Sequence, residues 1–160
     1  MFDEHYLKVL AIILSRLENL PHPWAVTGSL GLFLQGIEVD IHDIDLQSSK
    51  EGVFAMERAL KEFIVHQVKF LQNVNICSYL GELLIEGIKV EIMGEVQKRL
   101  PGGEWETPGD LSLSIRWVKL EGLSIPVFDL EFEYRAYRML GREEKAERIC
   151  AALVERKDSK

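Results

Sequence analysis

Three short stretches decide the fold that we expect for this chain: Val-Thr-Gly-Ser at residues 26–29, His-Asp-Ile-Asp-Leu at residues 42–46, and Lys-Val-Glu-Ile-Met at residues 89–93. The first ends an apolar run with a Gly-Ser pair, where a strand turns into a helix. The second is an Asp-x-Asp strand, and the third carries one acid inside an apolar strand. Together, and in this order, they indicate a metal-dependent phosphate site.

The acids of the second and third stretches are candidate metal ligands. Asp43 and Asp45 lie at i and i+2 of a strand, so they share one face, about 7 Å apart, and can bind hard cations from the same side. An Asp-x-Asp pair alone is weak evidence, because solvent-facing strand positions often carry acids. Glu91 either faces solvent or serves a site. If its strand lies beside the aspartate strand, the three acids converge and can hold two divalent ions.

The Gly28-Ser29 pair is a candidate anion site. At a strand-to-helix junction it offers backbone N–H groups, a helix dipole and a hydroxyl, and glycine allows a phosphate to approach the backbone. The alternative is structural, since serine is a common N-cap and glycine a common turn residue.

The remaining pattern predicts an α/β (α+β) chain with a mixed sheet. Gly and Pro residues mark 100–110 as a loop, and Glu121-Gly122 predicts a hairpin turn. We expect a domain at residues 1–128 and a helical extension packed on it at residues 129–160. The predicted helices are residues 4–20, 30–35, 53–63, 130–140 and 143–155, and the predicted strands are residues 24–27, 41–47, 68–71, 76–80, 83–85, 88–93, 114–120 and 124–128.

Composition limits the class of protein. The 160 residues are 47% apolar and 28% charged, typical of a soluble globular chain, and no apolar run approaches the roughly 20 residues of a membrane span. The acidic start differs from a secretory signal, so we expect a cytoplasmic protein. The net charge of -7 argues against nonspecific nucleic-acid binding. Cys77 and Cys150 show no metal-ligand spacing, which predicts free thiols packed as small hydrophobes.

The three stretches resemble the nucleotidyltransferase superfamily related to DNA polymerase beta, and specifically a small stand-alone member. The resemblance covers about residues 24–93 by motif, and the helix at 130–140 is similar to the short helical tail of small members. A second glycine is commoner in the family than Ser29, and an aspartate is often found where this chain has Glu91.

The resemblance implies a reaction and a set of residues. A nucleoside monophosphate would pass from a nucleoside triphosphate to a hydroxyl acceptor, with two Mg²⁺ (or Mn²⁺) ions and release of pyrophosphate. Gly28 and Ser29 would bind the triphosphate, Asp43 and Asp45 the metal, and Glu91 would complete the site and help to deprotonate the acceptor. The acceptor could be an aminoglycoside-like or lincosamide-like small molecule, a protein side chain or an RNA end, of which acidity disfavours the last.

Several further residues stay open. Lys50 is a candidate nucleotide-binding residue because it follows the acid strand, and Arg135, Arg138 and Arg142 could steer a triphosphate or acceptor, although such charges are usually solvated. Trp105 could stack on a base or stabilise its own loop. The rival function is a non-catalytic, antitoxin-like or regulatory role through a protein partner or homodimer. Intact acids favour the enzyme, because a binding module does not need clustered carboxylates.

Overall fold

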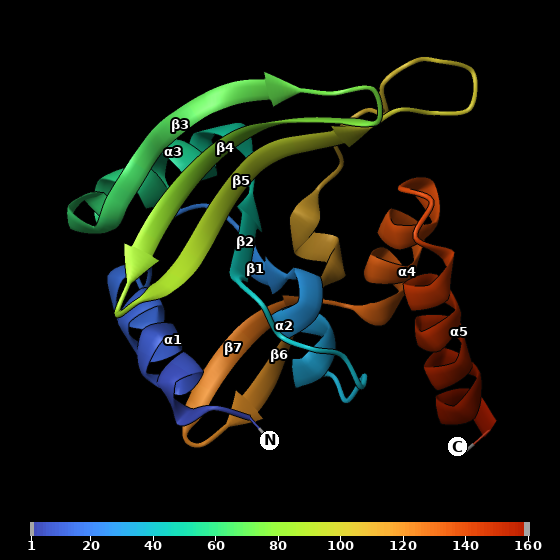
Figure 1. Cartoon of the computed structure of the whole chain (residues 1–160), viewed down its shortest axis with the longest axis horizontal. Helices are drawn as coiled ribbons and strands as arrows, with labels where there is room; N and C mark the ends of the chain where they lie inside the picture. The colour runs from blue at the N-terminus through green and yellow to red at the C-terminus, as the bar shows by residue number, and fades with distance from the viewer. Residues whose placement is uncertain (1, 159–160) are drawn as a thin grey trace.

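A computed structural model describes residues 2–158 of the chain. Its centre is a curved, mixed, seven-stranded sheet in the order β3-β4-β5-β2-β1-β7-β6 (Figure 1). The pairs β2–β5 and β1–β7 are parallel and the other neighbouring pairs are antiparallel. The strands are β1 (Trp24–Thr27), β2 (Ile44–Ser48), β3 (Ile64–Gln72), β4 (Ile76–Ile85), β5 (Ile88–Lys98), β6 (Ile115–Leu120) and β7 (Leu123–Phe128).

The α-helices start at capping residues that the sequence supplies. The side chains of Asp3, Ser49 and Asp129 accept hydrogen bonds from backbone N–H groups in the first turns of α1, α3 and α4. No helix within residues 2–158 combines the length and apolar character needed to cross a membrane. The helices are α1 (Glu4–Arg16), α2 (Gly28–Leu34), α3 (Lys50–Ala59), α4 (Leu130–Met139) and α5 (Glu143–Asp158), with 3₁₀ turns at Lys61–Phe63 and Leu111–Ser114.

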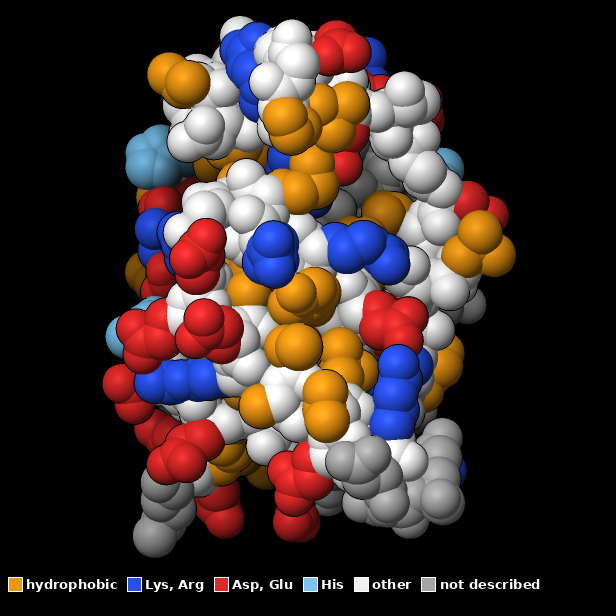
Figure 2. Space-filling view, turned by 90° about the vertical axis from the view of Figure 1, so that its right-hand side faces the viewer, with side chains coloured by type: hydrophobic (Ala, Val, Ile, Leu, Met, Phe, Trp, Pro, Cys, Tyr) orange, Lys and Arg blue, Asp and Glu red, His pale blue; other side chains and the backbone are white. Residues whose placement is uncertain are grey.

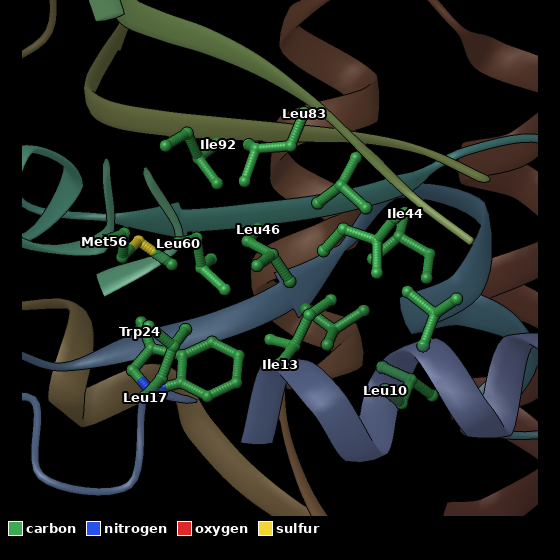
Figure 3. Close-up of a cluster of buried hydrophobic side chains, with 14 of the residues drawn as sticks. Leu10, Ile13, Leu17, Trp24, Ile44, Leu46, Met56, Leu60, Leu83 and Ile92 are labelled. Carbon is green, nitrogen blue, oxygen red and sulfur yellow. The ribbon is translucent and has the colours of Figure 1, made fainter. Parts of the chain in front are cut away.

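The main core explains why the acids face outward from it. Ile44 and Leu46 alternate with the aspartates and are fully buried against α1 and α3, with side chains such as Leu10, Ile13 and Met56 (Figure 3). Burying each such side chain contributes about 1.5–3 kcal/mol. Because strand side chains alternate, anchoring the apolar set in this core places Asp43, Asp45 and Glu91 on the opposite face of the sheet.

The C-terminal helices have a smaller core of their own. Residues of α2, α4 and α5, with Ile37 from the loop after α2, form a second buried cluster. In Figure 1, α4 and α5 stand together at the right, beside the site face of the sheet. The residues of the cluster are Leu32, Ile37, Leu130, Tyr137, Ala146 and Ile149. The C-terminal segment is therefore fixed to the sheet through α2.

The α+β class and the mixed sheet agree with the sequence prediction, but several boundaries were wrong. Strand β2 starts at Ile44 and not at residue 41, so Asp43 precedes it. The separate strands predicted at 76–80 and 83–85 are one strand, β4. Gly81 lies within β4 and makes no turn. It allows β3 to pack closely, because a Cβ at this position would lie 2.8 Å from Val68 Cγ2. Strand β3 is longer than the predicted 68–71, and α1 ends at Arg16 instead of residue 20.

Candidate active site

The pairing of β2 with β5 brings the predicted acids together. Asp45 and Glu91 are direct partners in the parallel register, and Ile44 pairs with Val90 one residue earlier. The condition under which Glu91 converges with the aspartates, that its strand lies beside theirs, is thus met. Asp43 lies directly before the first residue of β2.

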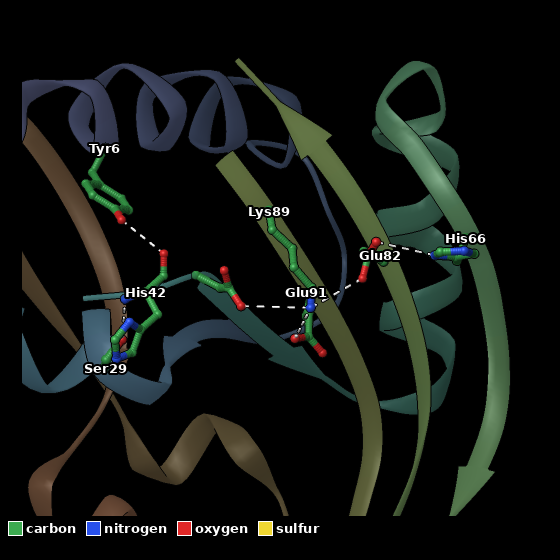
Figure 4. Close-up of polar contacts among 8 residues, drawn as sticks. Tyr6, Ser29, His42, His66, Glu82, Lys89 and Glu91 are labelled. Atoms are coloured by element: carbon green, nitrogen blue, oxygen red, sulfur yellow. Dashed lines mark hydrogen bonds and ion pairs between the residues drawn. The ribbon is translucent and has the colours of Figure 1, made fainter. Parts of the chain in front are cut away.

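Lys89 links Asp43 and Glu91 in the structure (Figure 4). Its Nζ lies 3.4 Å from Glu91 Oε1 and 3.9 Å from Asp43 Oδ2. The two carboxylate oxygens are therefore less than about 8 Å apart, within reach of a shared pair of metal ions. Lys89 also lies 3.4 Å from Glu82 on the neighbouring strand β4. The charge of Glu91 raises the pKa of Lys89, as expected for an ammonium group that neutralises several carboxylates.

Asp45 is the most perturbed of the three acids. Burial raises its pKa to about 7, and the charges of Glu91 and Asp43 add to the shift, while Lys89 and Arg142 oppose it. A nearby cation would stabilise the ionised form of a carboxylate in this environment. The electrostatics therefore favour a bound positive charge at Asp45.

The Thr27-Gly28 turn lies directly against Asp45. Thr27 is the sheet partner of Asp45, and Gly28 has a φ of +68°. A Cβ on Gly28 would overlap with Asp45 Oδ2, so only glycine fits this close approach without displacing the carboxylate. Ser29 has a different environment: its side chain is buried, and its Oγ accepts a 3.4 Å hydrogen bond from the backbone N–H of His42. The Ser29 hydroxyl thus holds the loop before β2.

Glu133 of α4 is a site residue that sequence reasoning missed. It is 2% exposed, and Thr27 Oγ1 donates a 2.5 Å hydrogen bond to its Oε1. Burial raises the pKa of Glu133 to about 8, although the Thr27 hydrogen bond and the charge of Lys98 oppose the shift. A signal was present in the sequence: Glu133 lies on the same helix face as Leu130 and Tyr137, within the apolar stripe of α4.

This buried acid predicts a pH-dependent stability. The pKa of Glu133 rises from 4.5 to about 8 on folding, so between these values the folded state retains a proton that the unfolded chain has lost. The free energy of unfolding should then fall as pH rises, by up to about 1.4 kcal/mol per pH unit from this group. Glu133→Gln cannot titrate. Urea unfolding at pH 5, 6.5 and 8 should show the variant gaining stability relative to wild type with pH, whereas parallel profiles would contradict the assignment.

A cavity of about 280 Å³ joins these residues. Both Arg142, from the turn between α4 and α5, and Lys98, at the end of β5, line it. It is bounded by the β1 turn, the acid face of β2 and β5, and α4. Its lining residues include Thr27, Gly28, Asp45, Glu91, Lys98, Glu133, Tyr137 and Arg142. The cavity therefore combines carboxylates, a close-approach glycine and cationic side chains.

A second cavity of about 260 Å³ adjoins the first and shares lining residues such as Gln47 and Lys98 with it. It lies between residues 106–111 and α4, and Arg135 and Glu106 are on its wall. Figure 2 shows the side of the molecule with α4 and α5, where basic and acidic side chains flank a band of hydrophobic ones. The two cavities are therefore neighbours along α4 and the end of β5.

Other candidates lie elsewhere or are used in the structure. Lys50 does not line the first cavity, and its Nζ lies 4.9 Å from the centre of the Tyr79 ring. Arg138 stacks on Tyr134, and Trp105 packs under Arg99, which supports its loop. These placements favour the structural interpretation of Trp105.

The cysteine prediction was half right. Both thiols are free, and Cys77 is buried, but Cys150 is exposed on α5. The expected packing role therefore holds only for Cys77.

The chemistry of the site fits a hard divalent cation, although the acids do not form a closed set of ligands. Within residues 2–158, no group of three His, Cys, Asp or Glu side chains is arranged to hold a metal ion. Asp43, Asp45 and Glu91 supply the oxygen donors that Mg²⁺ and Mn²⁺ prefer. Lys89 Nζ contacts both Asp43 and Glu91, so an ion bound between these two carboxylates would have to displace that ammonium group.

Comparison with known proteins decides the family. The family model described as aminoglycoside-2''-adenylyltransferase matches residues 9–152, which span the sheet, α4 and most of α5. The chain belongs to this family. The match confirms the resemblance to small nucleotidyltransferases, and it spans residues on both sides of the boundary that we expect after residue 128. No curated protein matches the chain.

Solved structures agree with this family assignment. The crystal structure of TM1012 from Thermotoga maritima, titled a "putative nucleotidyltransferase", shares 50% identity with a TM-score of 0.84, covering 97% of this chain and 96% of that one. The antibiotic-resistance factor ANT(2'')-Ia has a TM-score of 0.63 at 13% identity, over 95% and 86% of the two chains. The lincomycin-bound lincosamide adenylyltransferase LnuA has a TM-score of 0.52 at 15% identity, over 79% and 82%. The last two show a shared fold.

Proposed function

We propose that this chain transfers a nucleoside monophosphate from a nucleoside triphosphate to a hydroxyl group of a small molecule. The observation that carries the proposal is the pairing of Asp45 with Glu91 beside Gly28 in one cavity. This arrangement supplies carboxylates for metal binding at the point where the backbone can approach a phosphate. The family description names adenylyl transfer, so ATP is the first donor to test.

The chain's own residues divide the work of the reaction. The acceptor oxygen attacks the α-phosphorus, the bond from that phosphorus to the bridging oxygen breaks, and pyrophosphate leaves. Glu91 accepts the proton of the acceptor hydroxyl, and Gly28 allows the triphosphate to lie against Asp45. Arg142 on the cavity wall supplies positive charge for the phosphates.

Asp43, Asp45 and Glu91 are the residues that would hold the divalent ions. Bound Mg²⁺ or Mn²⁺ would stabilise the negative charge that develops on the phosphoryl oxygens. The neighbouring cavity is the proposed place for the acceptor, because it shares the lining residues Gln47, Lys98 and Phe132 with the cavity that Asp45 and Glu91 line. It has charges of both signs and the ring of Phe132, which suit a polar small molecule with an apolar part.

The activity test is direct. The purified chain is incubated with each of the four ribonucleoside triphosphates, Mg²⁺ and a panel of hydroxyl compounds that includes aminoglycosides and lincosamides, and pyrophosphate is measured. We expect release that depends on the acceptor, together with a nucleotidylated product by mass spectrometry. No release with any combination, with a protein partner that co-purifies with the chain, would instead favour the non-catalytic role.

Metal binding has its own prediction. Because the clustered carboxylates repel one another, Mg²⁺ or Mn²⁺ should raise the melting temperature of the wild type, and Asp45→Asn should remove most of this rise. The exposed Asp40 lies outside the cavity, so Asp40→Asn is the matched control and should respond like wild type. Thermal melts at several ion concentrations provide the measurement. Equal shifts in wild type and Asp45→Asn would rule out the metal assignment.

A further inference from the structure

Glu133 and Thr27 join two distant parts of the chain at the edge of the cavity. Thr27 ends β1 directly before Gly28, and Glu133 lies in the middle of α4. Their hydrogen bond spans 106 positions in the sequence, and both side chains line the cavity with Asp45. The contact therefore connects the C-terminal helices to the turn that we assign to the phosphates.

The Thr27 hydroxyl is not used for local structure. Thr27 occupies the N-cap position of α2, where a threonine side chain usually accepts a hydrogen bond from the first turn of its own helix. In this chain it makes no such bond. Its hydroxyl donates to Glu133 instead, so its conformation depends on α4.

The packing around Glu133 leaves space for this side chain. Gly31 of α2 faces it: a Cβ there would lie 4.0 Å from Glu133 Oε1 and only 3.0 Å from the carbonyl oxygen of Val26. Thus β1, α2 and α4 meet closely around one carboxyl group. A carboxyl group held neutral by burial can accept the hydrogen bond without adding charge to the neighbouring Asp45.

We propose that Glu133 is a positioning residue, which fixes the Thr27-Gly28 turn against Asp45 so that triphosphate binding depends on α4. This inference rests on the proposed function, because it assigns the nucleotide to that turn. Glu133 touches neither reacting atom, and it acts through Thr27. The expected defect is therefore in nucleotide affinity rather than in the chemical step.

Four single variants and one double variant test the contact. Thr27→Val and Glu133→Met remove either side of the hydrogen bond at similar size, and each should weaken ATP binding by about tenfold, with kcat changed less than about threefold. Glu133→Gln and Thr27→Ser keep an acceptor and a donor, and both should bind ATP within about threefold of wild type. The double variant Thr27→Val/Glu133→Met should be no weaker than the weaker single variant, because both changes break one contact.

Binding is measured by calorimetry with ATP and Mg²⁺, KM and kcat by pyrophosphate release, and folding by thermal melts. Glu131→Met changes an exposed acid of the same helix and is the control. Wild-type ATP affinity in Glu133→Met, or additive losses of ATP affinity in the double variant, would overturn this inference and leave the proposed function standing. Weaker binding in all three variants that lack the contact, in proportion to a loss of melting temperature, would show a structural role and would overturn it as well. If the wild type binds no nucleotide, the proposed function fails first and the inference with it.

Discussion

Replacing Glu91 with Gln should lower kcat for nucleotidyl transfer by about two orders of magnitude or more, while the nucleotide still binds. The amide keeps the size of the side chain but removes the proton acceptor and one negative charge beside Asp45. Stability should hold or rise, because the charge of Glu91 contributes to the raised pKa of Asp45. Steady-state kinetics and nucleotide titration on the same preparations measure the two effects.

The chain offers a matched control for this substitution. Glu82 is the direct cross-strand partner of Glu91 on β4 and also pairs with Lys89, but it does not line the cavity. Glu82→Gln should leave kcat within about threefold of wild type. Equal losses in both variants would mean that the general negative charge around Lys89 matters and that Glu91 has no specific role.

Placing a side chain at Gly28 should reduce nucleotide affinity by about a hundredfold or more. In Gly28→Ala the Cβ overlaps with the Asp45 carboxylate, so either the turn or a proposed metal ligand must move. The positive φ of Gly28 adds a backbone cost of about 1 kcal/mol. Gly28→Asp should have a larger effect, because it adds repulsion of the phosphates.

A second glycine variant can separate the cost of the positive φ from the overlap between the Cβ of residue 28 and Asp45. Gly122 has a similar φ of +79°, in the β6–β7 hairpin, and a Cβ there would meet no atom within 4 Å. Gly122→Ala should therefore share the loss of stability without the loss of affinity. Calorimetric titration with ATP, together with thermal melts of both variants, tests this. Nucleotide affinity that survives Gly28→Ala would move the phosphate site elsewhere.

The sequence predicted the part of the site that depends on local pattern. Alternation along a strand decides which side chains share a face, so Asp45 and Glu91 could each be placed on the face of their own strand opposite its apolar neighbours. The start of β2 could not be predicted in this way. Strand β1 turns into α2 after Thr27, the partner of Asp45, so residues before Ile44 have no strand to pair with on that side.

The rest of the site depends on tertiary packing. Glu133 reaches Thr27 only because the small core around Tyr137 and Leu32 holds α4 beside α2. Lys50 follows the acid strand in sequence, but it is the first residue of α3, after the N-cap Ser49. Its ammonium group lies over the ring of Tyr79. Such long-range placements have no periodic signal in the chain. The one indication in the sequence is a single acid within an apolar helical stripe, as at Glu133.

The central claim is that Asp43, Asp45 and Glu91 form one metal-dependent nucleotide site with the Gly28 turn. A crystal structure of the chain with Mg²⁺ and a nonhydrolysable ATP analogue tests it most directly. The account predicts metal ions between these carboxylates and the triphosphate, with the phosphates against Gly28 and the open side of the α-phosphate facing the second cavity. A nucleotide bound elsewhere, or bound with Lys89 still paired to Asp43 and Glu91 and no ion at Asp45, would contradict it.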